Sequence, residues 1–181
     1  MVTYCIGIAF LILCVFGVPL LRKLTHERTL KSLGMDGVTV LPRFWTLSGL
    51  RLERPQWTGE VVFRAAGPSG GRPGHLRLIA SFKRPSAPLP VPAAGSKVET
   101  GDAEFDRRIQ VEGDPAFARK FLVPEMRERL VELDRMGGRV LAIGETTVEI
   151  DGPLVGSPAV LRKFLELCAD IITGTAVAAA S

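Results

Sequence analysis

The chain has few of the residues on which hydrolytic and metal-dependent active sites depend. It contains two histidines, His26 and His75, and three cysteines among its 181 residues. A metal site or a Ser-His-Asp triad needs histidine at suitable spacings, and these two residues do not provide them. The cysteines form no Cys-x-x-Cys pair, and the glycine-rich stretches lack the Gly-Lys-Ser/Thr ending of a P-loop. We therefore predict no catalytic residue, no metal site and no cofactor.

Aromatic side chains are also scarce, and Tyr4 is the single tyrosine. The net charge of +4 would suit a polyanionic partner, but basic and acidic residues nearly balance from Ser32 onward. Proteins that bind single-stranded nucleic acid interleave basic residues with aromatic ones. This chain shows no such pattern, so nucleic acid is not among the partners that we expect.

Charge is missing altogether from Val2 to Leu21. A helix needs roughly 20 apolar residues to cross the hydrocarbon core of a bilayer, and this run is long enough. A core helix, a cleaved signal peptide and a lipoprotein signal are the alternatives. No basic residue precedes the run and no small-x-small cleavage site ends it, while Leu13 stands before Cys14 where a lipoprotein signal has a small residue. We therefore predict a transmembrane helix at residues 1–21.

Basic residues directly follow the uncharged run: Arg22, Lys23, Arg28 and Lys31, against the single acid Glu27. Because Lys and Arg that flank a span prefer the cytoplasmic side, we predict a single-pass protein of the cell membrane with its N-terminus outside and its C-terminal domain in the cytoplasm. The lack of a visible disulfide framework agrees with that compartment. Two interpretations of the four cations stay open: an ordinary positive-inside flank, or contact with an anionic lipid surface.

The first helix is expected to continue beyond the membrane. Leu24, Leu30 and Leu33 keep near-helical spacing, and Gly34 is a typical C-terminal cap. Residues 22–34 are therefore predicted to form a basic juxtamembrane stalk helix.

Residues 35–173 have the size of one domain with its own core. The part from 38 to 84 shows short apolar alternations broken by Gly and Pro, which indicate strands and turns. Residues 85–96 are a Pro-rich connector, either a linker or a packed crossing. Residues 97–173 are expected to form a β-α-β-β-α unit, and residues 174–181 a disordered tail. The predicted fold class is α+β, with a mainly antiparallel sheet covered by two or three helices.

Within the last unit, apolar residues alternate with polar ones from Phe105 to Val111 and predict a half-buried strand. Helices are expected to begin after Asp114 and at Pro124, because an acceptor cap and a proline suit the first turn. A last helix with a wide apolar stripe is expected to begin after Ser157 and to end at Gly174.

Between these helices lies the clearest hairpin pattern of the chain. Residues 139–143 and 146–150 are predicted to be its two strands, and Gly144-Glu145 joins them. The register that places the apolar residues on one face has Leu141 opposite Val148.

Two polar residues, Arg107 and His75, are weak candidates for a buried polar site. By alternation Arg107 lies on the buried face of its strand with Phe105, and a buried arginine needs a carboxylate partner. A snorkelling stem or an internal ion pair is favoured over a site for an anionic ligand. His75 stands at the mouth of another strand. Glu149 and Asp151 share a strand face, as paired carboxylates would, but that face is predicted to be solvated.

The segment from Thr100 to Asp114 reads Thr-Gly-Asp-Ala-Glu-Phe-Asp-Arg-Arg-Ile-Gln-Val-Glu-Gly-Asp. Together with the Pro124 helix and the short hairpin, it resembles the C-terminal part of uncharacterised bacterial membrane-anchored proteins that carry a T-G-D-x-x-F-D strand. The resemblance covers about residues 97–173. That family has no assigned activity, so the resemblance implies an anchor followed by a domain, and no ligand.

The function that the sequence favours is a non-catalytic binding or scaffolding module at the cytoplasmic surface of the membrane. One alternative is a small membrane-tethered hydrolase or transferase with a dispersed site. Another is a domain that contacts anionic lipid. The expected partners are the lipid bilayer and another membrane or cytoplasmic protein.

Overall fold

The computed structural model describes residues 18–43, 47–65, 74–83, 97–144, 146–155 and 157–180. Within these ranges no helix combines the length and the apolar composition that a membrane span requires. The Pro-rich connector and most of the predicted transmembrane helix lie outside the described residues, so both stay predictions.

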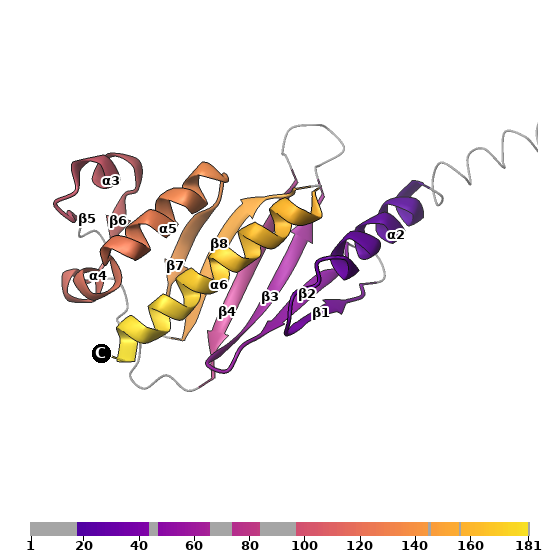
Figure 1. The fold of residues 1–181 in the computed structure, drawn as a ribbon, viewed down its shortest axis with the longest axis horizontal. Helices are drawn as coiled ribbons and strands as arrows, with labels where there is room; N and C mark the ends of the chain where they lie inside the picture. The colour runs from indigo at the N-terminus through magenta and orange to yellow at the C-terminus, as the bar shows by residue number, and fades with distance from the viewer. Residues whose placement is uncertain are drawn as a thin grey trace, which may run out of the picture.

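Six antiparallel strands form the central sheet, in the order β1-β2-β3-β4-β8-β7 (Figure 1). Strands β1 to β4 follow one another as neighbours, β8 joins the sheet beside β4, and β7 pairs with β8 at the far edge. The edges of the sheet are therefore β1 and β7. The strands are β1 (Val38–Leu41), β2 (Gly49–Glu53), β3 (Trp57–Arg64), β4 (His75–Phe82), β7 (Arg139–Ile143) and β8 (Thr147–Pro153).

One face of this sheet is apolar and buried, because buried and more exposed residues alternate along β3, β4 and β8. The register aligns Val61, Leu78 and Ile150 across these strands, and all three are 0% exposed. Trp57 is buried on the same face, and its indole N–H donates to the hydroxyl of Thr173 at 3.2 Å. The other face carries mainly polar and charged side chains.

Three helices cover the buried face: α2 (Val18–Lys31), α5 (Pro124–Arg135) and α6 (Pro158–Ala180). In Figure 1, α6 crosses the sheet diagonally and α2 lies at the β1 end. A smaller lobe stands beyond β7 and consists of the ribbon β5 (Lys97–Val98) and β6 (Val111–Glu112) with α3 (Ala103–Arg108) and α4 (Pro115–Phe121). The predicted α+β class, with an antiparallel sheet and several helices, is confirmed.

Glycine allows α6 to approach the sheet closely at Phe164. A Cβ atom on Gly152 of β8 would lie 2.3 Å from Phe164 Cζ, and one on Gly138 would lie 2.6 Å from Phe164 Cε2. Real Cβ atoms do not come this close to a ring. The ring of Phe164 therefore fills the space that two missing side chains leave, and it is 1% exposed.

The predicted helix end at Gly174 is wrong, and so is the disordered tail as far as Ala180, because α6 continues to that residue. Gly174 marks a close helix contact instead of a cap, since a Cβ atom there would lie 2.1 Å from Met126 Cε of α5. Beyond it Thr175 is 0% exposed and its hydroxyl donates to the carbonyl of Ile171 at 2.9 Å. Thr175 and Ala178 of this segment thus belong to the core.

The strand predicted from Phe105 to Val111 is also wrong. Residues 103–108 form helix α3, and strand structure begins only at Val111. The carboxylate of Asp102 accepts a hydrogen bond from the N–H of Phe105 at 3.1 Å and caps the helix. This local bond decides the conformation, and the alternation of apolar residues in the segment is incidental.

The hairpin of β7 and β8 is present, but its predicted register is wrong. Ile143, and not Leu141, pairs with Val148. A bulge follows Val140 and inserts one extra residue into β7. The bulge leaves Leu141 37% exposed, so this leucine does not belong to the buried face.

The predicted helix beyond the apolar run is present as α2, but one side of it packs against the sheet. His26 Nε2 lies 3.0 Å from the carbonyl oxygen of Ser48, and its ring meets Phe63 edge-on with centroids 4.8 Å apart. Leu30 and Leu33 are 2% and 3% exposed. The segment is therefore part of the domain and not a free-standing stalk.

Candidate functional site

The two candidates for a buried polar site, Arg107 and His75, do not come together. Arg107 is exposed, because its segment is helix α3 and not a half-buried strand. His75 is the half-buried first residue of β4, opposite Pro153. Strands β8 and β7 separate β4 from the lobe that carries α3. The predicted burial of Arg107 is thus wrong, and the two residues form no joint site.

The carboxylates of Glu149 and Asp151 share the polar face of the sheet, where Arg77 lies beside both. Its Nη1 is 3.9 Å from Glu149 Oε2, and its Nε is 3.6 Å from Asp151 Oδ1. Arg77 stands directly opposite Asp151 in the register. This is a cross-strand ion pair that stabilises the pairing of β4 with β8.

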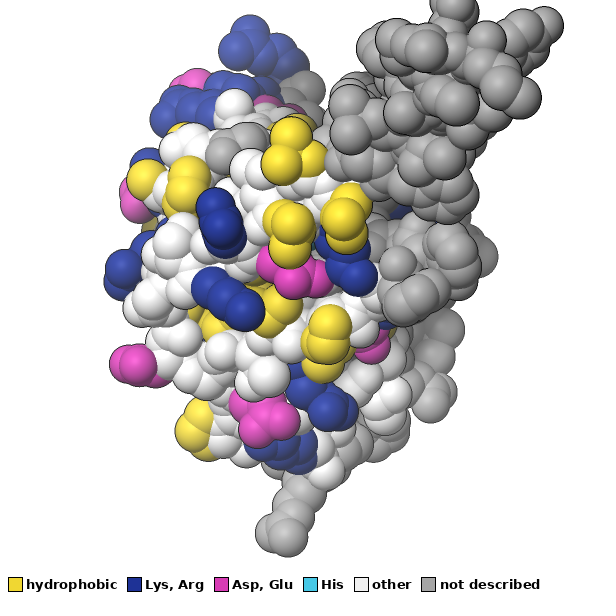
Figure 2. All heavy atoms as spheres, turned by 90° about the vertical axis from the view of Figure 1, so that its right-hand side faces the viewer, with side chains coloured by type: hydrophobic (Ala, Val, Ile, Leu, Met, Phe, Trp, Pro, Cys, Tyr) yellow, Lys and Arg dark blue, Asp and Glu magenta, His cyan; other side chains and the backbone are white. Residues whose placement is uncertain are grey.

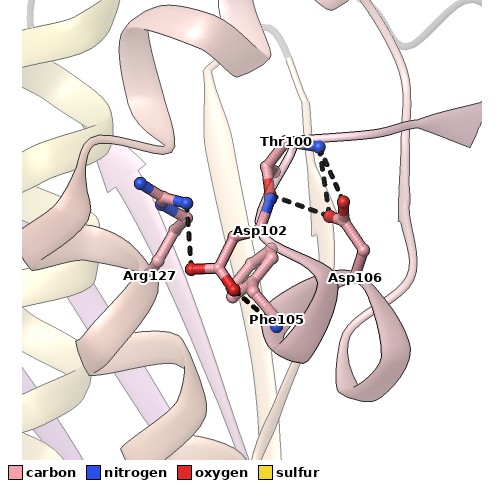
Figure 3. Close-up of polar contacts among 5 residues, drawn as sticks. All are labelled: Thr100, Asp102, Phe105, Asp106 and Arg127. Carbon is pink, nitrogen blue, oxygen red and sulfur yellow. Dashed lines mark hydrogen bonds and ion pairs between the residues drawn. The ribbon is translucent and has the colours of Figure 1, made fainter.

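The Thr-Gly-Asp-x-x-Phe-Asp motif forms a local lock around the start of α3 (Figure 3). Thr100 donates to the carboxylate of Asp106 from its main-chain N–H at 3.1 Å and from its hydroxyl at 2.8 Å. Gly101 has a φ of +80°, which residues with a side chain rarely adopt. Asp102 caps the helix, and Phe105 is 2% exposed in the core. Each fixed letter of the motif therefore has a structural role.

The lock also joins the lobe to the rest of the domain. Arg127 of α5 donates to Asp102 Oδ2 at 3.1 Å (Figure 3). Desolvation raises the pKa of the Asp106 carboxyl, but hydrogen bonds from Thr100 and from the N–H of Gly101 outweigh it and bring the pKa below the ordinary value of 3.8. These contacts hold the lobe in place.

A cleft of about 760 Å³ lies between α3 and α5, with Lys163 of α6 at its side. Four of its charged side chains form two ion pairs. Arg127 binds Asp102, and Lys163 Nζ lies 2.7 Å from Glu132 Oε1. These pairs account for much of the polar lining, and they tie together the three helices around the cleft.

A second cleft, of about 660 Å³, runs between β7 and the lobe and is the better candidate. Residues 139–143 of β7 form one wall, and residues 108–114, which include β6, form the other. We call it the edge groove. Its lining is largely apolar, and the rings of Phe117 and Phe121 lie stacked there with centroids 5.8 Å apart. Other apolar lining residues are Ile109, Val111, Leu122, Leu130, Leu133, Val140 and Ile143.

The hydrogen bonds of the hairpin show where the main chain of β7 points. Gly144 N–H donates to the carbonyl of Thr147 at 2.7 Å, so these two residues form a hydrogen-bonded pair. The next pair along an antiparallel ladder is then a non-hydrogen-bonded one, and that pair is Ile143 with Val148. The N–H and C=O of Ile143 therefore point away from β8, towards the edge groove. Among the described residues, none beyond the hairpin binds them.

Most charged groups at the rim of the edge groove are already engaged. Arg108 Nη2 donates to Asp134 Oδ2 at 2.9 Å, and Asp114 caps α4. Glu112 accepts a hydrogen bond from a neighbouring glutamine side chain at 2.7 Å. Arg139 is exposed and has no ion pair within the described part of the chain. Arg139 is therefore the rim cation without an ion pair among the described residues, while the carboxylates of Glu112 and Asp114 are hydrogen-bonded to neutral groups.

The sequence contains only a weak signal for this groove. A strand of five residues, Arg139–Ile143, is short enough for an edge, and Phe117 and Phe121 lie four residues apart on one side of α4. Both facts are compatible with many folds. The groove exists because the lobe stands beside β7, and that is a tertiary arrangement.

Comparisons with known proteins add no identification: no family model, no curated protein and no solved structure matches the chain. The fold nevertheless defines a structural class. The described residues form an α+β domain with one covered sheet face and a groove along an edge strand. The resemblance to membrane-anchored bacterial proteins stays a prediction.

Proposed function

We propose that the protein is a membrane-anchored, non-catalytic binding module whose edge groove takes an extended segment of a partner protein as an added strand on β7. The observation that carries the proposal is the outward-facing main chain of Ile143 in an apolar groove. The membrane anchor rests on the uncharged run from Val2 to Leu21, and the cytoplasmic placement rests on the cations that follow it.

An open strand edge recruits other strands, and proteins usually protect such edges. Two features limit what can pair with β7. The bulge after Val140 distorts the ladder, and the lobe stands on the far side of the groove. A single extended segment would fit between β7 and β6, whereas the edge of another sheet would meet the lobe. The arrangement therefore favours peptide binding by strand addition over edge-to-edge aggregation.

The lining indicates the chemistry of the bound segment. Side chains of an added strand alternate between two faces, so apolar side chains at every second position would meet the aromatic floor at Phe117 and Phe121. An acidic residue near Arg139 would meet the one rim cation that lacks an ion pair among the described residues. We therefore expect an extended apolar segment with an acidic residue at one side.

The proposal can be tested with a library of random peptides selected against the full-length protein in nanodiscs. Enriched peptides are synthesised, and their affinity is measured by fluorescence anisotropy. The variant Ile143→Pro removes the N–H that faces the groove and keeps the hairpin bonds. We expect it to weaken binding about tenfold or more, because an unmade buried hydrogen bond costs about 1–3 kcal/mol. Arg139→Glu should weaken acidic peptides selectively.

The matched control is Val38→Pro on β1, the opposite edge of the sheet. Glu53 N–H donates to the carbonyl of Gly37 at 2.7 Å, so the neighbouring pair of Val38 with Leu52 is the non-hydrogen-bonded one. The N–H of Val38 therefore also points outward. If both prolines weaken binding equally, the effect is a general loss of stability and strand addition at β7 is refuted. Unchanged binding by Ile143→Pro also refutes it.

A further inference from the structure

The exposed side of α2 changes from leucine to cation along its length. Leu20, Leu21 and Leu24 are 58%, 67% and 47% exposed. Arg28 and Lys31 are exposed one and two turns further on. Because residues three and four apart share a face of a helix, Leu20, Leu24, Arg28 and Lys31 form one continuous row.

The opposite side of α2 is fully occupied by the domain. Leu24 and His26 are two positions apart, about 200° around the helix, and His26 contacts Ser48 and Phe63. Glu27, the only acid of the helix, accepts a hydrogen bond from Ser48 Oγ at 2.7 Å and lies 4.0 Å from Lys23 Nζ. Glu27 lies beside the exposed row, three residues from Leu24 and four from Lys31, but its carboxylate is engaged by Ser48 and Lys23 and 22% of its side chain is exposed. The row itself consists of leucine and cations.

From this arrangement we propose that the exposed row of α2 lies on an anionic lipid surface, with its leucines at the acyl boundary and Arg28 and Lys31 among the headgroups. The proposal rests on the membrane anchor of the proposed function and adds a second contact that holds the domain against the bilayer. Figure 2 shows the side of the molecule on which α2 and β1 lie, where hydrophobic, basic and acidic side chains are interspersed.

Two observations favour lipid over a protein partner. The exposed leucines directly continue the uncharged run that ends at Leu21, so they stand where a helix leaves the hydrocarbon. Arg28 and Lys31 come later in the helix, farther from the uncharged run. In a membrane interface apolar side chains likewise lie deeper than the cations that contact the headgroups. Arg28 and Lys31 have no ion pair within the described residues, and anionic headgroups would supply the missing charge.

The four cations after the uncharged run do not all take part equally. Lys23 is half withdrawn towards Glu27, with 26% of its side chain exposed. The side chain of Arg22 lies outside the description. Arg28 and Lys31 are therefore the two cations of this group that are exposed and have no ion pair within the described part of the chain, and the lipid test uses these two residues.

The lipid contact would also orient the edge groove. α2 contacts β1, and β7 is the other edge of the sheet. Five strand spacings of about 4.8 Å separate the two edges, so the groove lies about 24 Å across the sheet from the membrane-facing side. A domain seated on α2 therefore presents β7 to the aqueous phase.

The test uses the full-length protein in nanodiscs of phosphatidylcholine, with or without phosphatidylserine. A photoreactive amino acid replaces Leu24, and in a control protein it replaces Val123, which is 43% exposed at the start of α5. We expect lipid adducts at position 24 that increase with phosphatidylserine, and none at position 123. The double variant Arg28→Gln/Lys31→Gln should lower the equilibrium constant for docking of α2 on the lipid surface about 25-fold. Each cation near an anionic surface raises such a constant about fivefold.

The charge-matched control is Arg119→Gln/Lys120→Gln, which removes two exposed cations from α4. It should leave the adduct yield at position 24 unchanged. Lipid adducts that do not depend on phosphatidylserine would overturn the proposal, and so would adducts at position 24 to a second copy or to another protein. Flotation of the nanodiscs is measured first. A chain that fails to float refutes the anchor itself, whereas a chain that floats without anionic adducts refutes only the seating of α2.

Discussion

The contact between Phe164 and the sheet predicts a sharp difference between two glycine substitutions. Gly152→Ala in β8 would place its Cβ atom 2.3 Å from Cζ, 2.8 Å from Cε2 and 3.1 Å from Cε1 of Phe164. The ring is 1% exposed and also lies over Gly138, so it cannot turn away from the new methyl group. Gly152 has no positive φ, and the whole cost is therefore steric.

We expect Gly152→Ala to lower the free energy of unfolding by about 2–3 kcal/mol, the upper part of the range for one extra carbon in a packed core. The second substitution, Phe164→Leu, removes ring atoms and makes room for the methyl group. The double variant should therefore be less destabilised than the sum of the two single variants, with a coupling of at least about 1 kcal/mol.

Gly174→Ala is the contrasting case, although its nearest contact is closer. The added Cβ atom would lie 2.1 Å from Met126 Cε, which is the end of a flexible side chain. The next nearest atom to the added Cβ is Met126 Sδ, at 3.8 Å. Met126 can change rotamer at small cost. Alanine also favours the interior of α6 over glycine by up to about 1 kcal/mol. We expect this variant to lie within about 1 kcal/mol of the parent protein.

Urea unfolding of the full-length protein in mild detergent, followed by circular dichroism, measures both effects. Equal m-values across the set would show that the variants change stability and not the extent of unfolding. A Gly152→Ala protein as stable as the parent, or a Gly174→Ala protein that is the less stable of the two, would refute the steric reasoning.

Three further predictions concern the lock and the core. Asp102→Ala should lower the free energy of unfolding by about 1–2 kcal/mol through loss of the α3 cap, together with loss of the ion pair to Arg127, whereas Asp102→Asn, which keeps an acceptor oxygen but not the charge, should cost less in the same urea experiment. The folded-state pKa of Asp106 lies below its ordinary value of 3.8. The stability that the Asp106 carboxylate contributes is therefore complete above that pH and is lost as the pH falls through the lowered pKa. In Thr100→Val, urea unfolding curves between pH 5 and pH 2 should show a weaker dependence of the free energy of unfolding on pH. An unchanged pH dependence would contradict the lock. Burial raises the pKa of the Cys168 thiol, so a maleimide at about pH 8 should modify it only on unfolding, and rapid labelling of native protein would contradict its placement.

The sheet was predictable where burial imposes a regular period. In β3 and β4 one face is buried against helices, so every second residue is apolar and the sequence shows strands directly. The same rule failed from Phe105 to Val111, because the cap at Asp102 is a single side-chain contact and has no period. It failed at Gly174 because a glycine that ends a helix and one that admits a neighbouring helix look alike in one sequence.

The register of the last hairpin could not be derived from side chains alone. Both Leu141 and Val140 are apolar, so either can be assigned to the buried face. The bulge resolves this choice by turning Leu141 outward while Val140 stays opposite Ile150. One inserted residue changes every pairing beyond it, and nothing in the composition of β7 marks its position.

The binding surface proposed for the edge groove consists largely of main-chain atoms, and such a surface would leave no chemical motif in the sequence. The most distinctive segment, from Thr100 to Asp106, is used for folding, and the side chains of Thr100, Asp102 and Asp106 have partners within the lobe or on Arg127. The groups that face the edge groove are the N–H and C=O of Ile143, which any residue except proline would present equally. A site of this kind constrains backbone direction and leaves side-chain identity almost free. The sequence at position 143 therefore has only to avoid proline and needs no particular side chain. For this reason the substitution that tests the site is Ile143→Pro.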